Sequence, residues 1–301
     1  MKLLMENWRK FLNEDISLNE QLKKADLPFI KKFLALKDLP LDQYVQGLKK
    51  IAGNPGFRKV ATAGQTDAGG ASDEAVTTGL GKKKASELLP TQKDIGFYNS
   101  LKDQVTNPSW KPVNAILSGE TVEMGNPAGP ILTYKGKYIL DGHHRWSQVM
   151  MMNPEAEMSI ADISGAALGD AEEALKATQL AIAAYSGKLK TKPLGGPDLM
   201  QASAEAVKKY VIQNITDEVL QLMTQAGKIP EPKKELAAEY FAKTLALIQS
   251  RQGPFDRETS MPQADHTGGK GTQNAVNALL GKGAINFDDP QPKDVKKTSR
   301  E

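Results

Sequence analysis

The stretch Pro130–Met150, PILTYKGKYILDGHHRWSQVM, decides the fold expected for this chain. Two short apolar runs flank a Lys-Gly-Lys turn at residues 135–137, and this pattern predicts a β-hairpin. Asp141 and Gly142 follow the second strand. A helix is predicted over about residues 144–152, because the Asn-Pro pair that follows disfavours helical geometry. The sequence therefore predicts a strand that passes into a helix through an Asp-Gly turn.

The composition is that of a soluble globular protein, and it excludes several kinds of site. Of the 301 residues, 40% are hydrophobic and 25% are charged, which is enough apolar surface for a packed core. The lack of cysteine excludes disulfides, thiolate nucleophiles and cysteine-rich zinc sites. A net charge of +3 is too small to indicate a nucleic-acid coat, although DNA stays open as a partner. Because the chain has no run of about 18 apolar residues, no membrane partner is expected.

Shifts in composition divide the chain into five parts. Apolar residues at helical spacing predict a helical N-terminal part over 1–51 and a helical C-terminal region over 170–252. Residues 52–84 are rich in Gly, Ala, Thr and Asp, and they predict a flexible linker. Residues 85–165 carry the strand-like runs. Residues 253–301 predict a mostly irregular tail that is ordered only over 273–280.

The elements expected within these parts combine strands with helices. Two strands are predicted besides the hairpin, at residues 112–119 and 157–164. Three amphipathic helices are predicted over residues 171–186, 203–226 and 233–251. The sequence therefore predicts an α+β fold, with a small mixed sheet-and-helix core and helical N- and C-terminal extensions.

The Asp-Gly-His-His-Arg segment is the candidate functional site. Gly142 allows a sharp turn, and the amides after it lie at a helix N-terminus, where unpaired N–H groups and the helix dipole favour an anion. Charge-assisted hydrogen bonds from His143, His144 and Arg145 would match phosphate oxygens. Asp141 could bind Mg²⁺ or orient an imidazole. The segment therefore predicts a phosphate-binding site.

Other interpretations of the paired histidines stay open. Adjacent histidines in an arbitrary protein are mostly part of a solvated turn or a core contact. A zinc site is disfavoured because neighbouring side chains on a helix diverge by about 100°. His266 is the one other histidine that could join His143 and His144.

The chain resembles the ParB/sulfiredoxin fold. Pro130–Met150 is similar to the family's hairpin and helix-start signature, and SELLPTQKDI at residues 86–95 is similar to its upstream Leu-x-Pro box. The resemblance covers residues 85–165. It implies that Gly142, His143, His144 and Arg145 contact the phosphates of a nucleotide (ATP, ADP or CTP), with Mg²⁺ as the accompanying ion.

Departures from the family narrow the chemistry that the resemblance implies. Sulfiredoxins carry their catalytic cysteine where this chain has His143, so that reaction is ruled out. The partition ParB proteins carry Gly-Glu-Arg-Arg in this turn, and only Gly142 and Arg145 match that pattern. This mismatch weakens the prediction that the turn binds CTP as the partition ParB proteins do.

Members that phosphorylate free amino acids share the Asp-Gly-His-His-Arg motif in full. They carry a catalytic glutamate just after the Leu-x-Pro box, where this chain has Thr91 and Gln92. Glu87 and Asp94 lie near enough in the sequence to act as the base instead, although a surface role is also open to both.

The site supports three functional hypotheses. The first is nucleotide-dependent phosphotransfer or nucleotide hydrolysis, with Arg145 and His144 clamping phosphate, Asp141 contacting the metal and His143 acting as acid or base. The second is a Mg²⁺-dependent DNA-nicking nuclease in which His143 or His144 acts on a phosphodiester. The third is a non-catalytic binding module of a virion or of a DNA-partition system. In the first two hypotheses the catalytic residues are Asp141, His143 and His144.

Residues 1–20 resemble the capsid-targeting leaders of proteins packaged inside the heads of large tailed phages. Leu12-Asn13-Glu14 and Leu18-Asn19-Glu20 both fit the Leu-x-Glu cleavage sites of such leaders. The resemblance implies a phage origin, capsid or other virion proteins as partners, and a location in the cytoplasm of an infected bacterial host or inside the virion. An ordinary helix that packs Trp8 and Phe11 on the body is the alternative.

Overall fold

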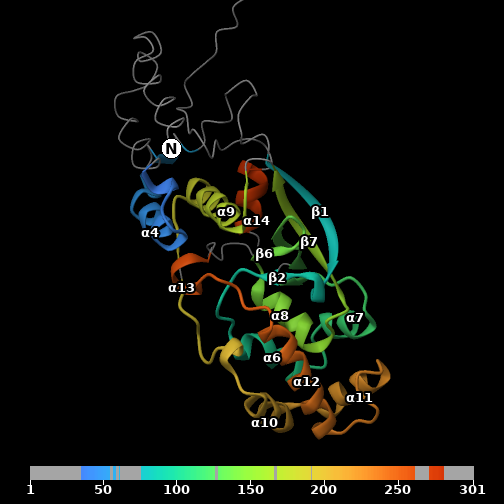
Figure 1. Ribbon diagram of the computed structural model, residues 1–301. Coiled ribbons are helices and arrows are strands. Elements are labelled where there is room, and N and C mark those ends of the chain that lie inside the picture. The colour runs from blue at the N-terminus through green and yellow to red at the C-terminus, as the bar shows by residue number, and fades with distance from the viewer. Residues whose placement is uncertain are drawn as a thin grey trace, which may run out of the picture.

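The computed structural model places a five-stranded mixed sheet between two groups of helices (Figure 1). The α+β class and the helical extensions predicted from the sequence are confirmed. The described helices include none with the length and apolar character needed to cross a membrane. The predicted leader at residues 1–20 and the first part of the N-terminal helical region lie outside the described residues, which are 35–54, 57–58, 61, 76–125, 128–165, 168–190, 192–261 and 271–280.

The sheet has the strand order β1-β7-β5-β6-β2. Strand β1 is antiparallel to β7, β7 is parallel to β5, β5 and β6 form an antiparallel hairpin, and β6 is parallel to β2. The predicted hairpin is therefore confirmed, with a turn in which Lys135 and Gly136 both have positive φ. The strands are β1 Val76–Lys84, β2 Leu89–Pro90, β5 Ile131–Tyr134, β6 Tyr138–Asp141 and β7 Glu157–Gly165, and a separate pair is formed by β3 Met124–Gly125 and β4 Ala128–Gly129.

The flexible linker predicted for residues 52–84 is wrong at its C-terminal end. Residues 76–84 form β1, which pairs with β7 along its whole length, from Val76 opposite Gly165 to Lys84 opposite Glu157. The prediction failed because it counted large apolar side chains, whereas a strand at the edge of a sheet is held by backbone hydrogen bonds. Leu80, the one large apolar residue near the middle of β1, is 83% exposed.

The strand predicted at residues 112–119 is also wrong. Residues Pro112–Ser118 form helix α7, which has a proline in its first turn and ends at Gly119 in the left-handed conformation. A short apolar run does not distinguish a strand from one or two turns of helix. The proline at the start and the glycine at the end are the helix signals that decide the matter.

Each face of the sheet is covered by its own group of helices. On one face α8 lies at the centre of a core that includes the fully buried Trp146, whose indole N–H donates to Ala85 O at 2.9 Å. This face holds α6 Phe97–Thr106, α7, α8 His143–Met152, α10 Ala204–Asn214, α11 Asp217–Gln225 and α12 Lys234–Gln249, with the short 3₁₀ turns η2 Ala85–Glu87 and η3 Leu199–Gln201. The other face holds α4 Leu41–Ile51, α9 Ala171–Ser186, α14 Gly271–Ala275 and the π-helical η4 Val276–Leu280.

The C-terminal helical region shares a core with the sheet. The helices predicted at 171–186 and 233–251 are confirmed as α9 and α12, whereas the one predicted at 203–226 is two helices, α10 and α11, separated at Ile215 and Thr216. The Tyr240 hydroxyl donates to Met152 O at 2.7 Å, and the Thr244 hydroxyl donates to Met151 O at 2.9 Å. Helix α12 is thereby tied to the end of α8.

Residues 253–261, which include the short helix α13 Arg257–Ser260, cross the loop that follows β2. We call this segment the C-terminal strap. Phe255 N–H donates to Thr91 O at 3.0 Å, and Lys93 N–H donates to Phe255 O at 2.6 Å. The predicted irregular tail is therefore held in place at its beginning, because its backbone forms a strand-like bridge with Gln92.

Replacement of Gly253 by alanine is expected to displace the strap. An added Cβ would lie 2.4 Å from the carbonyl carbon of Thr91, and backbone at that distance cannot yield without moving the loop. We expect Gly253→Ala to lower the free energy of unfolding by about 3 kcal/mol in urea denaturation. Gly195→Ala is the matched control, because no atom lies within 4 Å of the added Cβ. A Gly253 variant as stable as the control would contradict the packing of the strap.

Candidate functional site

Gly142 makes the turn from β6 into α8 possible. Its φ of 105° and ψ of 20° lie in the left-handed region that side chains other than glycine's rarely adopt. An added Cβ would lie 2.6 Å from Ile131 Cγ2 on the neighbouring strand. The structure thus bears out the Asp-Gly turn predicted from the sequence, and the turn requires glycine for both conformation and space.

The N-terminus of α8 carries no side-chain cap. Gly142 occupies the N-cap position, and the first backbone hydrogen bond of the helix runs from Trp146 N–H to Gly142 O at 2.9 Å. The backbone N–H groups of His143, His144 and Arg145 precede that bond, so they have no carbonyl partner within the helix. Such a terminus favours an anion through its N–H groups and through the helix dipole.

His143 holds the loop after β2 rather than facing solvent. Its side chain is 4% exposed, and Nε2 accepts hydrogen bonds from the N–H groups of Thr91 at 3.2 Å and Gln92 at 3.1 Å. Burial lowers the pKa of His143 well below 6.5, and the positive charges of Arg257 and Arg145 lower it further. The ring is therefore neutral, and its Nε2 is engaged with backbone donors.

His144 makes an equivalent contact at the other end of the same loop. Its Nε2 accepts a hydrogen bond from Gly96 N–H at 3.0 Å. Burial lowers the pKa of His144 from 6.5 to about 4, and the positive charges of Arg257 and Lys192 contribute. Successive side chains on a helix diverge by about 100°, so the two rings reach opposite ends of residues 91–96, which we call the 91–96 loop. The pair of histidines is a clamp on backbone amides.

Arg145 uses much of its donor capacity within the protein. Its Nη1 donates to the carbonyl oxygens of Met124, Gly129 and Pro130 at 3.4, 3.1 and 3.0 Å. Its Nη2 lies 3.3 Å from Asp141 Oδ2. The guanidinium therefore fixes the segment that contains β3 and β4, and it neutralises the carboxylate at the end of β6.

Asp141 is the candidate metal ligand that the site retains. It ends β6, and its side chain is 38% exposed. Among the described residues no group of three or more His, Cys, Asp or Glu side chains is arranged to hold a metal ion. Mg²⁺ commonly takes one or two protein carboxylates and completes its shell with phosphate oxygens and water. A single carboxylate beside a helix N-terminus could hold such an ion only together with ligands from a bound anion and water.

The two candidate bases have different positions. Glu87 is exposed and accepts a hydrogen bond from Lys84 N–H at 3.0 Å in the turn η2, which contacts Pro154 beyond the C-terminus of α8. The structure does not bring Glu87 to the site. Asp94 lies in the 91–96 loop, and its Oδ1 accepts a hydrogen bond from Arg257 N–H at 2.9 Å. Burial raises the pKa of Asp94, which suits a carboxylate acting as a base.

Arg257 is a site residue that the sequence analysis missed. It comes from α13 in the C-terminal strap, and its Nη1 donates to Gln92 Oε1 at 3.3 Å. Its charge acts on both histidines, and the carboxylates of Asp94 and Asp141 are close enough to raise its pKa against the lowering effect of burial. No ion pair joins it to a carboxylate of the described residues. Most of its N–H donors are thus left for an external anion.

No local signal in the sequence identified Arg257. It lies in a polar segment without apolar periodicity, far from the Asp-Gly-His-His-Arg motif along the chain. Only the pairing of Phe255 with the 91–96 loop brings it to the start of α8. Comparisons of the chain with family models, curated proteins and solved structures find no match.

The stability of the protein is expected to fall as the pH drops from about 7 to about 5. The pKa of His144 is about 4 in the folded protein and about 6.5 when unfolded, so its contribution is present above pH 6.5 and is lost as the pH falls toward 4. His144→Gln keeps an acceptor for Gly96 N–H but cannot titrate. Between these pH values we expect the variant to lose about 2 kcal/mol less unfolding free energy than the wild type in urea titrations. Equal losses in both proteins would contradict a neutral, clamped His144.

Proposed function

We propose that this chain is a nucleotide-phosphate-binding protein of the ParB/sulfiredoxin type that acts as a phosphotransferase or a nucleotide hydrolase. The observation that carries the proposal is the arginine of the strap, Arg257, which contacts Gln92 and Asp94 in the loop held by the first two residues of the uncapped helix α8. Its guanidinium donates to a neutral amide oxygen and has no carboxylate ion-pair partner among the described residues. Planar guanidinium groups and helix N-termini both bind phosphate oxygens.

The charges around α8 support an anionic ligand. The positive charges of Arg257 and of the exposed Lys192 are close enough to His144 in α8 to lower its pKa. The two imidazoles are neutral, so they neither add to this positive charge nor repel it. Asp94 and Asp141 act on Arg257 without forming an ion pair with it, so its guanidinium keeps N–H donors for a phosphate group.

The positions of the upstream Leu-x-Pro box and the Asp-Gly-His-His-Arg turn support the resemblance to the ParB/sulfiredoxin fold. The Leu-Pro pair of the upstream box is β2, and β2 is parallel to β6, the strand that leads into the Asp-Gly-His-His-Arg turn. The two motifs thus meet at one end of the sheet, where the histidines contact the residues that follow the box. This arrangement suits a shared phosphate site.

The structure suggests a division of roles within the proposed reaction. The α8 amides and Arg257 would bind the phosphates, and Asp141 would share Mg²⁺ with them. The ion would neutralise charge on the transferring group. Asp94 would accept the proton of the attacking group. His143 and His144 would position the 91–96 loop, which carries Asp94, so we assign them a positioning role in place of the acid–base role predicted from the sequence.

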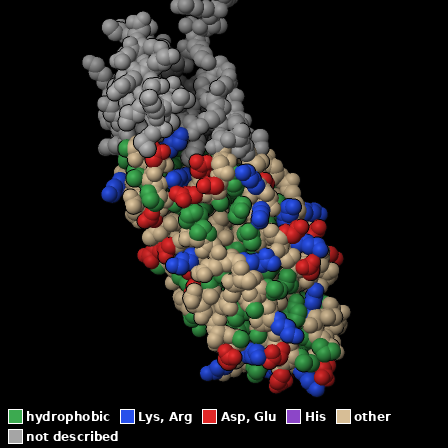
Figure 2. Space-filling model, viewed as in Figure 1, with side chains coloured by type: hydrophobic (Ala, Val, Ile, Leu, Met, Phe, Trp, Pro, Cys, Tyr) green, Lys and Arg blue, Asp and Glu red, His purple; other side chains and the backbone are tan. Residues whose placement is uncertain are grey.

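The nuclease hypothesis receives less support. It needs an imidazole that is free to act on a phosphodiester, whereas Nε2 of each histidine accepts backbone N–H donors. On the face of the molecule shown in Figure 2, basic and acidic side chains are interspersed rather than gathered into a basic surface for DNA. A non-catalytic phosphate anchor is the alternative that remains closest to the proposal.

Nucleotide binding should depend on Arg257. We expect wild-type protein with Mg²⁺ to bind and turn over at least one of ATP, ADP, CTP and GTP, and Arg257→Ala to weaken binding by about tenfold or more because a charge-assisted bidentate contact is lost. Arg257→Lys should recover part of the affinity. Lys209→Ala removes a positive charge from the exposed surface of α10 and serves as the control. Calorimetric titration gives the affinities, and release of phosphate gives the turnover.

The outcomes separate the hypotheses. Binding without turnover would favour the non-catalytic anchor, and nicking of supercoiled plasmid without added nucleotide would favour the nuclease. A wild-type protein that binds none of the four nucleotides would overturn the proposal. Arg145→Ala is expected to act differently from Arg257→Ala, lowering stability as well as binding, because Arg145 holds three carbonyl groups.

We also propose that the protein is packaged in a phage head and acts in the infected bacterial cell. The leader-like residues 1–20 support this proposal. If it is correct, mass spectrometry of purified particles will find a chain that begins at Asp15 or Gln21, because cleavage follows Leu-x-Glu. A chain in particles that begins at Met1 would count against cleavage.

A further inference from the structure

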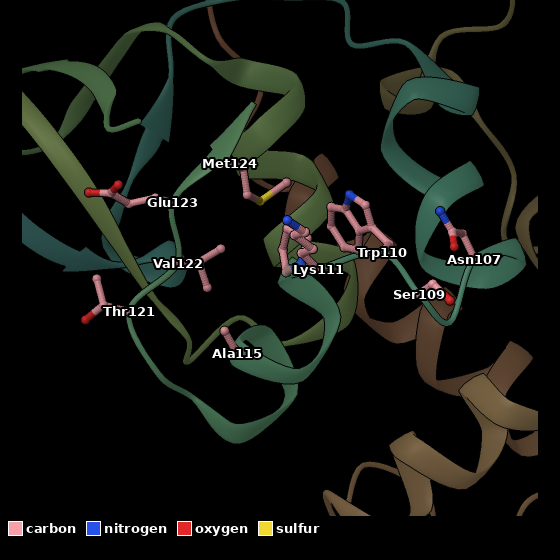
Figure 3. A pocket seen from close by; sticks show the side chains of 10 residues that line it. Asn107, Ser109, Trp110, Lys111, Ala115, Thr121, Val122, Glu123 and Met124 are labelled. Atoms are coloured by element: carbon pink, nitrogen blue, oxygen red, sulfur yellow. The ribbon is translucent and has the colours of Figure 1, made fainter. Parts of the chain in front are cut away.

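A groove of about 520 Å³ lies apart from the residues that contact the 91–96 loop (Figure 3). One wall is the connection between α6 and α7, which includes Asn107, Ser109, Trp110 and Lys111. The opposite wall is the segment from Thr121 that leads into β3. Its volume is in the range of sites that hold a small organic molecule.

The walls of the groove are held by the core. Asn153 Nδ2 donates to Ile116 O of α7 at 2.7 Å, and Thr121 Oγ1 donates to Glu157 Oε2 at 3.0 Å. Val122 exchanges backbone hydrogen bonds with the first residues of β7, and its side chain is 3% exposed. The groove is therefore preformed, so a ligand would not need to order its walls.

Trp110 gives the groove an aromatic wall with a free donor. The ring is partly buried against the core, and in Figure 3 it lies across the groove from Val122. No described residue accepts a hydrogen bond from its indole N–H. The other apolar residues of the lining are the partly buried Ala115 and the almost fully buried Val122 and Met124. The partly buried Trp110 ring is therefore the surface that suits a flat ring.

The charged side chains of the groove differ in position. Lys111 lies on the Trp110 side of the groove in Figure 3, whereas the Glu123 carboxylate extends toward the opposite edge. Both side chains are exposed, and neither forms an ion pair with a described residue. On the Trp110 side the groove thus offers the Lys111 ammonium group and the indole N–H, together with the polar side chains of Asn107 and Ser109. The ammonium group and the indole N–H are donors, and they favour a negatively charged substituent.

We propose that this groove binds a planar aromatic anion, with the ring on Trp110 and the negative group at Lys111. Two kinds of small molecule share this chemistry: a mononucleotide, through its base and phosphate, and an aromatic carboxylate. The proposal does not depend on nucleotide binding at α8, because it uses none of the residues assigned to that site.

The test is calorimetric titration of the full-length protein with AMP and with 4-hydroxybenzoate. Adenosine and 4-hydroxybenzamide are the uncharged counterparts, and ribose 5-phosphate is an anion without an aromatic ring. We expect one of the two aromatic anions to bind with a Kd in the millimolar range or below. Trp110→Ala should weaken it by about tenfold or more. Lys111→Gln should weaken the charged probe several-fold and leave its uncharged counterpart unchanged.

Two controls separate this groove from the α8 site. Lys102→Gln, on the exposed surface of α6, should leave the binding of every probe unchanged. Arg257→Ala should also leave the proposed binding unchanged. If binding of a probe is abolished by Arg257→Ala and retained in Trp110→Ala, that probe occupies the α8 site, and the assignment to the groove is overturned. Wild-type protein that binds neither aromatic anion at millimolar concentration likewise overturns it. If Trp110→Ala fails to fold, the test rests on Lys111→Gln, which changes an exposed side chain. An unchanged affinity of that variant for the aromatic anion overturns the proposal.

Discussion

The amides of the 91–96 loop need acceptors, and the adjacent imidazoles of His143 and His144 provide them. An Nε2 atom accepts a hydrogen bond only when it carries no proton, so both rings must be neutral. Burial secures this state, and the neighbouring cations reinforce it. The position of the loop depends on this contact between ring nitrogens and backbone, and so does the docking of the C-terminal strap, which pairs with Thr91 in that loop.

The same contact changes which residues of the site can supply positive charge. A neutral histidine cannot supply the positive charge that a phosphate site requires, and Arg145 is occupied with three backbone carbonyl groups and Asp141. In the proposed phosphate site, Arg257 of the strap supplies that charge. Because Arg257 donates to a neutral amide and faces no carboxylate at ion-pair distance among the described residues, its charge is available to a ligand. Residues that hold the site together are thus largely separate from those proposed to bind phosphate.

Met124 connects the proposed phosphate site with the Trp110 groove. It is one of the residues that line the groove, and its carbonyl oxygen accepts a hydrogen bond from Arg145 Nη1. The segment leading into β3 therefore belongs to both places. The arginine that neutralises Asp141 also fixes one wall of the groove, so the geometry of the two sites is set by a common network of hydrogen bonds.

The sequence by itself determined the β5–β6 hairpin, the turn at Gly142 and helix α8, because a tight turn, a glycine and an apolar pattern act over a few neighbouring residues. It also singled out His143 and His144, but not their role, since the donors they bind lie some 50 residues away in the chain. Only the tertiary structure decided that residues 76–84 form a strand, because the backbone of β7 supplies their partners. Likewise, only the tertiary structure brought Arg257 to the start of α8, because the strap pairs with the 91–96 loop through backbone groups that leave no mark on the sequence.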